Sequence, residues 1–321
     1  MRILELQGST IRDYRTGREE ALPSVPSAVT VGSYDGLHVG HRKIIGTMVA
    51  RARSEGLRSV VVTFKPHPRF VLDPASPCPV RLLTTLEEKI GYLEPMDVDL
   101  LLVVRFDAAF AQRTSSDFIR DVLVGMLGAR LVVVGYDHGF GHDRSGSGAT
   151  LQSLGEEYGF GVEVVGEFLV GGEPVSSTRI RRLLLEARIG EANECLGAPY
   201  PVGGTVVEGR RLGREIGFPT VNLRLANPCK HLPAMGVYVA KTSIDGREFH
   251  AMMNIGLRPT VSSGDEVTVE AHILGYSGEL YGRELTFGLL AYLREERRFE
   301  SVPALRAQLE ADKKMVELNR E

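Results

Sequence analysis

Five short apolar runs in the first half of the chain do most to constrain its fold. Each run is continuous rather than alternating in apolar character, which is typical of strands buried on both faces of a parallel sheet. Segments with helical spacing separate the runs. The runs are residues 28–32, 59–64, 99–104, 130–135 and 162–166, and the helical segments are residues 41–54, 86–94, 115–127 and 150–158. This alternation predicts repeated βαβ units and therefore a doubly wound α/β sheet.

The second half of the chain has a different texture. Strand-like runs there are separated by Gly and Pro, and no helical pattern intervenes until residues 301–318. Asp245-Gly246 is a good two-residue hairpin turn, because both residue types tolerate positive φ. These features predict an antiparallel sheet or barrel with one terminal helix. The predicted domains are residues 1–187 and 188–321.

Charge and composition argue against two classes of partner. The formal net charge is −3, so the chain lacks an overall basic footprint for nucleic acid. No run approaches the ~20 apolar residues that a membrane span needs. The three cysteines are far apart and lack a metal-ligand spacing, which fits a reducing, cytoplasmic setting. The mixed-sign stretch 293–301 is typical of a solvated face, and nothing in the composition indicates an oligomeric state.

The stretch "VTVGSYDGLHVGHRKII", residues 29–45, runs from the first strand into the first helix. Glycines there let the backbone approach a ligand closely, and the helix N-terminus favours a phosphate. Two imidazoles could donate to phosphoryl oxygens in a transition state. The alternative is that one histidine caps the helix and the glycines only turn the chain. The candidate phosphate-site residues are Gly32, Tyr34, Asp35, Gly36, His38 and His41.

The His-x-Gly-His spacing resembles the signature of the nucleotidyltransferase superfamily, which includes class I aminoacyl-tRNA synthetases. Those synthetases pair it with a Lys-Met-Ser-Lys-Ser-type loop, and none occurs here. The chain instead has "VSSTRIR" at 175–181, where Ser177, Thr178 and Arg181 at a helix start could hold the outer phosphates of ATP. The alternative is an ordinary Ser/Thr cap with surface arginines.

Two loops after later strands are candidates for a flat aromatic ligand. "TFKPHPRF" at 63–70 has two prolines that stiffen it, which favours an apolar ledge. A plain strand-end turn with buried rings is the alternative. The glycine-rich loop at 132–148 lies at the same edge of the predicted sheet. The candidates for contact with this aromatic ligand are Phe64, Pro66, His67, Pro68 and Phe140, and Asp137 is a nucleotide-site candidate.

A second glycine-rich segment, "GRRLGREIGFPTVNL" at 209–223, lies in the second half. Gly213, Arg214 and Gly217 could wrap phosphates with backbone amides and positive charge. Thr220 and Asn222 alternate on a strand and so share one face, and their oxygens suit Mg²⁺ with a nucleotide phosphate. The alternative is a polar strand edge that faces solvent.

Glu270 interrupts an otherwise apolar strand within residues 267–273. A partly desolvated carboxylate could accept a proton from an alcohol nucleophile. The alternative is that Glu270 simply faces outward.

These motifs, in this order, resemble the prokaryotic bifunctional riboflavin kinase/FMN adenylyltransferases. The matching stretches are "GSYDGLHVGH", "FKPHP", "GYDHGFG", "SSTRIR", "GFPTVNL", "MNIGLRPTV", "VEAHI", "ELYG" and "LREERRFES". The resemblance implies a Rossmann-like nucleotidyltransferase domain followed by a six-stranded antiparallel barrel. It also implies phosphorylation of riboflavin by MgATP to FMN, and then attack of FMN on the α-phosphate of ATP to give FAD and pyrophosphate.

The resemblance assigns roles to the candidates. His38 and His41 steady the α-phosphate, Asp137 contacts the nucleotide, and the "SSTRIR" residues bind the β- and γ-phosphates. Glu270 is the base for the riboflavin 5′-hydroxyl, and Thr220 and Asn222 bind Mg²⁺.

Two alternatives to a bifunctional enzyme remain, and the first follows from departures of this sequence from the family's motifs. The loop at 137–148 lacks the aromatic-Arg-Phe-Gly run of the family, so one alternative retains a single activity, most plausibly the kinase. Tyr34 in place of Phe and Val221 in place of Ala are smaller departures. The other alternative is a flavin-binding regulator without catalysis, which the presence of Glu270, Thr220 and Asn222 disfavours.

Overall fold

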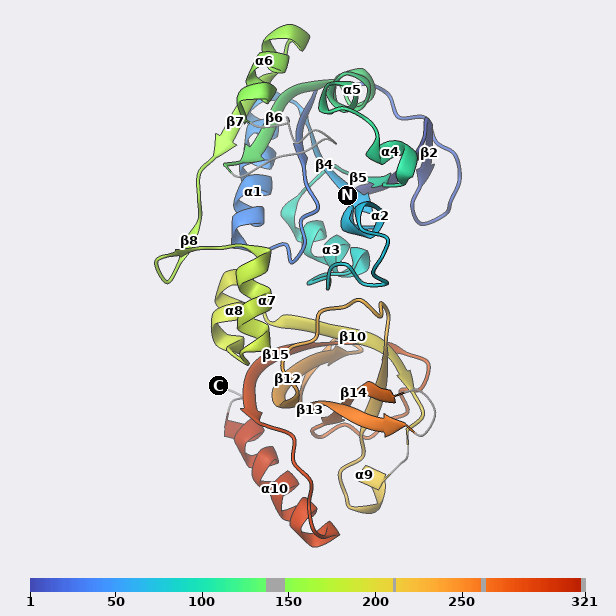
Figure 1. The fold of residues 1–321 in the computed structure, drawn as a ribbon, viewed down its shortest axis with the longest axis vertical. Coiled ribbons are helices and arrows are strands. Elements are labelled where there is room, and N and C mark those ends of the chain that lie inside the picture. Colours follow the sequence, from blue (N-terminus) through green and yellow to red (C-terminus); the bar gives the residue numbers. More distant parts are fainter. Residues whose placement is uncertain (137–147, 210–211, 261–263, 319–321) are drawn as a thin grey trace. The chain divides into compact units, whose positions relative to one another are not determined.

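The computed structural model describes residues 1–136, 148–209, 212–260 and 264–318 (Figure 1). The chain forms two compact units, Met1–Val175 and Ser176–Glu321. The helix that begins at Ser177 therefore groups with the second unit, whereas the sequence-based division at 187/188 assigns it to the first domain. That division remains a prediction about the domains.

The first unit is built on a seven-stranded sheet of order β2-β1-β5-β4-β3-β6-β7. All neighbouring pairs are parallel except the β1–β2 hairpin. The five predicted runs are confirmed as β3 to β7. From β3 the sheet extends through β4 and β5 on one side and through β6 and β7 on the other, so the strand order reverses at β3. Such a switch point places a ligand crevice beyond the carboxyl end of β3. The strands are β1 Arg2–Gln7, β2 Thr10–Asp13, β3 Ser27–Val31, β4 Arg58–Lys65, β5 Leu100–Arg105, β6 Ala129–Gly135 and β7 Gly161–Val165.

Helices cover both faces of this sheet, as continuous apolar strands require. Residues of α1 and α3 pack against one face with Val61 and Leu101, and residues of α5, of the π-helical segment after it and of α6 pack against the other with Val60 and Leu102. The helices are α1 Val39–Glu55, α2 Arg69–Leu72, α3 Leu86–Leu93, α4 Ala108–Ala111, α5 Ser115–Phe118 and α6 Gly148–Tyr158; the π-helical segment is Ile119–Met126, and β8 Leu169–Val170 and β9 Glu173–Pro174 form a small ribbon.

The described part of the second unit contains the predicted six-stranded antiparallel barrel, in the order β10-β11-β14-β13-β12-β15. Asp245-Gly246 joins β12 to β13 with φ values of 51° and 78°, so the predicted hairpin turn is confirmed. The elements are α7 Ser177–Leu185, α8 Ile189–Leu196, β10 Tyr200–Val207, α9 Leu212–Glu215, β11 Val221–Leu225, β12 Gly236–Ile244, β13 Arg247–Thr260, β14 Gly264–Ile273, β15 Glu284–Arg294 and α10 Val302–Leu318.

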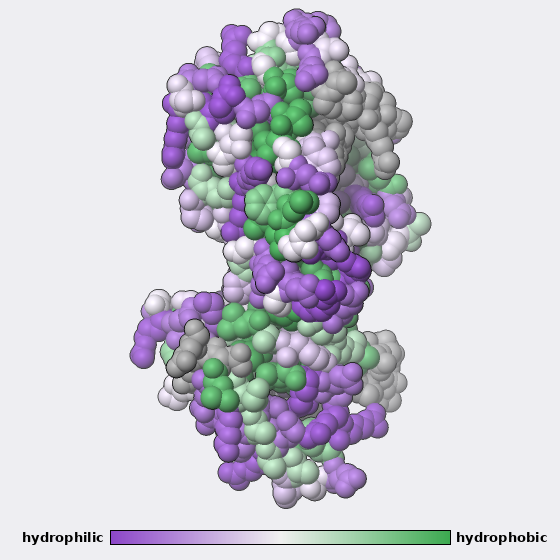
Figure 2. Space-filling view, turned by 90° about the vertical axis from the view of Figure 1, so that its left-hand side faces the viewer, coloured by the Kyte–Doolittle hydropathy of each residue, from purple (hydrophilic) through white to green (hydrophobic). Residues whose placement is uncertain are grey.

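The surface mixes charged and apolar side chains. On the face drawn in Figure 2, islands of apolar surface are surrounded by polar residues. In the region of β7 and β8, Val164, Phe168 and Leu169 are exposed. Within the described ranges, no helix has both the length and the apolar character needed to cross a membrane.

Candidate active sites

The histidine-containing loop begins where β3 ends, and its backbone is tightly constrained. A side chain at Gly32 would place its Cβ 2.9 Å from the Tyr34 ring, so that position requires glycine. Tyr34 is buried with φ of 46°, and its hydroxyl lies 2.6 Å from Thr30 Oγ1. Burial raises the pKa of Tyr34, so its hydroxyl stays protonated. Tyr34 therefore shapes the loop from inside rather than contacting a ligand from the surface.

His38 and His41 form a stacked pair at the start of α1. Their ring centroids are 3.6 Å apart, and His38 Nδ1 accepts a hydrogen bond from the His41 backbone N–H at 3.3 Å. His38 is thus the N-cap, so the capping alternative holds for this residue. Nδ1 of His41 is buried and has no hydrogen-bond partner in the part of the chain that the structure describes. Burial first, and then the charges of His38 and Lys89, lower the pKa of His41 well below its usual value.

Asp35 has a supporting role that its position in the turn did not reveal. Its side chain is 4% exposed and accepts hydrogen bonds from the backbone N–H groups of Leu83 and Thr84 at 2.9 and 3.1 Å. Gly36 N–H donates to Thr84 Oγ1 at 2.9 Å. These bonds tie the loop after β3 to the segment that precedes α3.

Lys89 is a residue that sequence reasoning missed. Its side chain is 6% exposed, and Nζ donates to the Ser33 carbonyl at 2.5 Å and to Thr63 Oγ1 at 3.2 Å. These acceptors lie at the carboxyl ends of β3 and β4, where the crevice is expected. Burial lowers the pKa of Lys89 to about 8, although Asp35 raises it. The only sequence signal for the burial of Lys89 is its placement among the apolar residues of α3.

The "FKPHP" loop only partly fits the predicted ledge. The Phe64 ring packs against Phe106, Phe110 and Phe118, with centroids 5.7 to 6.4 Å away. The buried-ring alternative therefore describes Phe64. Pro66 is exposed, and His67 and Pro68 are half-buried. Asp137 and Phe140 lie outside the described residues.

The "SSTRIR" motif forms the first turns of α7. Ser176 is the N-cap, because its side chain accepts from Arg179 N–H at 3.2 Å. Ser177, Thr178 and Arg181 follow in the helix, so their side chains lie near its N-terminus. The cap alternative holds for Ser176, while binding of the outer ATP phosphates by the other three remains a prediction.

The barrel brings together the predicted base and metal ligands of the second half, Glu270, Thr220 and Asn222. Asn222 is the cross-strand partner of Glu270 on one side, and Asn254 is its partner on the other. Thr220 Oγ1 lies 3.5 Å from Glu270 Oε2. Val269 and Ala271 are buried inside the barrel, so Glu270 points to the outer face, as the bland alternative held, and is half-buried there.

The glycine-arginine segment lies directly against this group. A Cβ on Gly209 would lie 2.2 Å from Asn222 Nδ2, and one on Gly213 would lie 2.3 Å from the Phe218 carbonyl oxygen. Gly217 has a φ of 86°, which favours glycine. Gly209 and Gly213 therefore permit close packing against Asn222 and Phe218, around a short helix, α9, that the sequence did not predict, while phosphate binding by this segment remains a prediction.

A cavity of about 590 Å³ opens beside Thr220. Residues of five stretches of the second unit line it, and one of them is the loop 276–281, which the sequence did not predict to line a site. The lining residues are Val206, Arg214, Pro219, Thr220, Val221, Ala271, Ile273, Tyr276, Ser277, Gly278, Glu279, Leu280 and Tyr281. The cavity is large enough to hold part of a nucleotide or flavin.

The donor set around Glu270 fits Mg²⁺ better than a transition metal. Hydroxyl, amide and carboxylate oxygens meet there, which are the hard ligands that Mg²⁺ prefers. Across the described ranges, no cluster of three or more His, Cys, Asp or Glu side chains could hold a metal ion. A Mg²⁺ ion here would therefore keep waters or phosphate oxygens as its other ligands.

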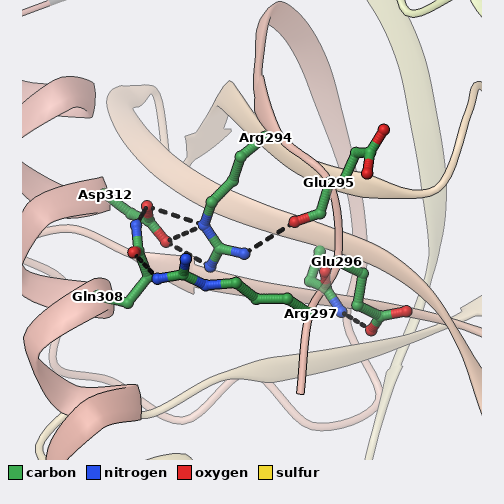
Figure 3. A network of polar contacts seen from close by, with 7 residues as sticks. Arg294, Glu295, Glu296, Arg297, Gln308 and Asp312 are labelled. Atoms are coloured by element: carbon green, nitrogen blue, oxygen red, sulfur yellow. Dashed lines mark hydrogen bonds and ion pairs between the residues drawn. The ribbon is translucent and has the colours of Figure 1, made fainter. Parts of the chain in front are cut away.

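A polar network fixes the end of β15 to α10 (Figure 3). Asp312, 3% exposed, accepts from Arg294 Nε and Nη2 at 3.1 and 2.7 Å. Glu296 Oε1 accepts from Asn254 Nδ2 at 3.1 Å, next to Glu270. The prediction that residues 293–301 form only a solvated face is therefore wrong for Arg294, because its charge is paired with a buried carboxylate.

The two sites define the class of protein. The first unit places imidazoles at a helix N-terminus beyond a parallel sheet, an arrangement that binds phosphate. The second unit places the Glu270 carboxylate 3.5 Å from Thr220 Oγ1, and Thr220 also lines the cavity. Both arrangements are of the kind that suits a transferase acting on nucleotides.

Comparisons with known proteins give the family. The FAD synthetase family model matches residues 23–179, and the riboflavin kinase family model matches residues 196–318. A bifunctional riboflavin kinase/FMN adenylyltransferase from Escherichia coli (strain K12) is 38% identical, covering 90% of this chain and 91% of that protein. One from Pseudomonas fluorescens is 36% identical, covering 88% and 89%. The chain belongs to the bifunctional riboflavin kinase/FMN adenylyltransferase family.

A solved structure is similar to most of the chain. A protein from Streptococcus pneumoniae described as a macrolide-efflux protein has a TM-score of 0.84 and 31% identity, covering 92% of this chain and 95% of that one. Efflux is part of the description of the Streptococcus pneumoniae protein and is not stated of this chain. Both family models that match this chain concern flavin chemistry, so the chain phosphorylates riboflavin and adenylylates FMN with ATP, producing FAD. The single-activity and regulator alternatives are not supported.

Proposed function

We propose that the two activities are divided between the two sites, with riboflavin phosphorylation at Glu270 and adenylyl transfer at His38 and His41. The observation that carries this division is the position of Glu270 between Asn222 and Asn254, with Thr220 Oγ1 at 3.5 Å. A carboxylate in this position combines a base with the oxygen ligands of a nucleotide site.

In the kinase reaction, Glu270 accepts the proton of the riboflavin 5′-hydroxyl as its oxygen attacks the γ-phosphate of ATP. Thr220 and Asn222 would hold Mg²⁺, which would supply positive charge to the phosphate oxygens. Arg214, which lines the cavity, binds the phosphates together with the backbone at Gly213 and Gly217.

In adenylyl transfer, an FMN phosphate oxygen attacks the α-phosphate and pyrophosphate leaves. Because His38 Nδ1 accepts a hydrogen bond, a neutral His38 carries its proton on Nε2 and can donate it to a phosphate oxygen. His41 is neutral because its pKa is lowered, so it also acts as a hydrogen-bond donor rather than as a cation. The positive end of the α1 dipole also stabilises negative charge on the phosphate.

The remaining candidates keep the roles in adenylyl transfer that the sequence predicts. Ser177, Thr178 and Arg181 bind the β- and γ-phosphates from the N-terminus of α7. Pro66, His67 and Pro68 form the rim against which the flavin packs, supported by the half-buried Phe64. Asp137 and Phe140 keep their predicted nucleotide and flavin roles. We place the enzyme in the cytoplasm.

The test is a pair of substitutions assayed by chromatographic separation of flavins. Glu270→Gln should lower FMN formation from riboflavin by at least 100-fold, within the range that loss of a general base costs, while FAD formation from added FMN is unchanged. His41→Asn should show the opposite pattern. Glu284→Gln, an exposed glutamate of the same barrel, is the matched control and should change neither rate. If either site variant loses both activities, the division is wrong.

A further inference from the structure

His272 lies on the same outer face of β14 as Glu270, and no role has been assigned to it above. The register of β11 and β14 pairs Asn222 with Glu270 and Val221 with Ala271. Continued by one residue, this register sets Thr220 opposite His272. The histidine therefore adjoins the segment that delivers Thr220 to the kinase site.

A specific hydrogen bond joins His272 to this segment. Its Nδ1 lies 2.8 Å from the Pro219 carbonyl oxygen. Since a carbonyl only accepts, Nδ1 must carry the proton and donate. Proline has no N–H, so the carbonyl is the sole backbone group by which Pro219 can be held.

The residue before Pro219 is anchored as well. Phe218 is 4% exposed and packs in an apolar cluster with Val239, Leu274 and Val316 of α10. Its ring meets the His272 ring edge to face at 5.2 Å, and its N–H donates to the Gly213 carbonyl at 2.7 Å. Thr220 itself is exposed, so its backbone position depends on these neighbours.

We propose that His272 is a positioning residue for riboflavin phosphorylation: by holding the Pro219 carbonyl it fixes Thr220 beside Glu270. This inference rests on the proposed function of Thr220 and Glu270. His272 does not take part in proton transfer in this scheme, and its contribution is geometric. Loss of the bond should loosen the start of β11 and weaken binding of ATP more than it slows the chemical step.

The choice of substitutions follows from the atom that donates. Asparagine places its side-chain N–H close to the position of Nδ1 and should keep the bond, whereas His272→Leu fills similar space without a donor. His272→Leu should raise KM for ATP in riboflavin phosphorylation about tenfold, equivalent to about 1.4 kcal/mol and comparable to one hydrogen bond. His272→Asn should stay within about threefold of the parent protein, and kcat should change less than KM in both.

A second readout reports on the protein without substrate. Hydrogen exchange of the peptide spanning residues 218–224 should be faster in His272→Leu than in the parent protein and close to parental in His272→Asn. FAD formation from added FMN is the internal control, and His250→Asn, in β13, is the matched substitution of another barrel histidine. Both controls should leave the rates unchanged.

Three results would overturn the inference. One is a His272→Leu variant with parental KM and exchange, and another is equal loss in the leucine and asparagine variants. The third is loss of both activities in His272→Leu with normal behaviour of the asparagine variant, which would indicate a global packing role. Glu270→Gln distinguishes failure of the proposed function from failure of the inference about His272. If Glu270→Gln remains an active kinase, the proposed function fails. If Glu270→Gln is inactive while His272→Leu behaves like the parent protein, only the role of His272 is refuted.

Discussion

Replacing Lys89 with Met should make the first unit more stable at neutral pH while it weakens adenylyl transfer. Lys89 is 6% exposed and keeps a positive charge at the carboxyl ends of β3 and β4. Burial is the largest influence on its pKa, which falls from the ordinary 10.5 to about 8. A charge that is costly to bury, at the edge where phosphate is expected, is a reason to look for function.

The size of the effect follows from this pKa. A difference of about 2.5 pH units corresponds to a cost of about 3 kcal/mol at pH 7, where the lysine is protonated in both the folded and the unfolded states. Between pH 8 and 10.5 the unfolded chain binds more protons than the folded chain, so the free energy of unfolding rises with pH. From pH 7 to 9.5 the wild-type protein should gain about 2 kcal/mol from this group, and the variant should gain none. The Ser33 carbonyl keeps a donor after the substitution, since Thr63 Oγ1 lies 3.4 Å from it.

The assay follows thermal unfolding of the first unit from pH 7 to 9.5. A unit of this size gains about 2–4 °C in unfolding temperature per kcal/mol. The unfolding temperature of Lys89→Met should therefore exceed that of wild type at pH 7, and this difference should shrink by roughly 4–8 °C by pH 9.5. Lys43→Met, at an exposed lysine of α1, should show no such pH-dependent difference. FAD formation from FMN should fall about tenfold or more in Lys89→Met, as expected for loss of a fixed positive charge near developing phosphate charge, while FMN formation stays unchanged. A pH-independent difference in unfolding temperature, or unchanged FAD formation, would refute the reasoning.

Two further predictions concern the barrel. Asp312→Ala leaves a mostly buried arginine without its carboxylate and should destabilise the second unit by about 3 kcal/mol, measured by chemical unfolding; Glu310→Ala, on the exposed side of α10, should change stability by less than 0.5 kcal/mol. Gly213→Ala would drive a Cβ to within 2.3 Å of the Phe218 carbonyl, so riboflavin phosphorylation should fall at least tenfold, the order expected when displacement disturbs catalytic positioning, with FAD formation from FMN preserved. Gly190→Ala, whose Cβ would meet nothing within 4 Å, is the control, and an equal loss in both glycine variants would contradict the argument.

Several elements could be predicted because burial is encoded locally. Continuous Val and Leu runs specify strands that are covered on both faces, and all five became strands of the parallel sheet. Asp245-Gly246 specified its hairpin through the φ values that these two residues tolerate. The β1–β2 hairpin was not predicted, since both of its strands lie before the repeated pattern begins.

Other features depend on contacts between distant segments. Lys89 reads as a surface residue of a helix until α3 is laid across the ends of β3 and β4. Phe64 reads as a ligand platform until its ring is found among Phe106 and Phe110. Asp35 reads as a ligand contact until the N–H groups of residues 83–84 are placed against it.

The sequence by itself determined the fold class, the family and the chemical types at each site, because periodicity and short motifs are local properties of the chain. Only the tertiary structure decided which side chains meet. Register, not sequence distance, sets Glu270 between Asn222 and Asn254, and the same register brings His272 to the Pro219 carbonyl. Hydrogen bonds extend over about 3 Å, so a shift of one residue in that register would turn these side chains to the opposite face of the barrel wall.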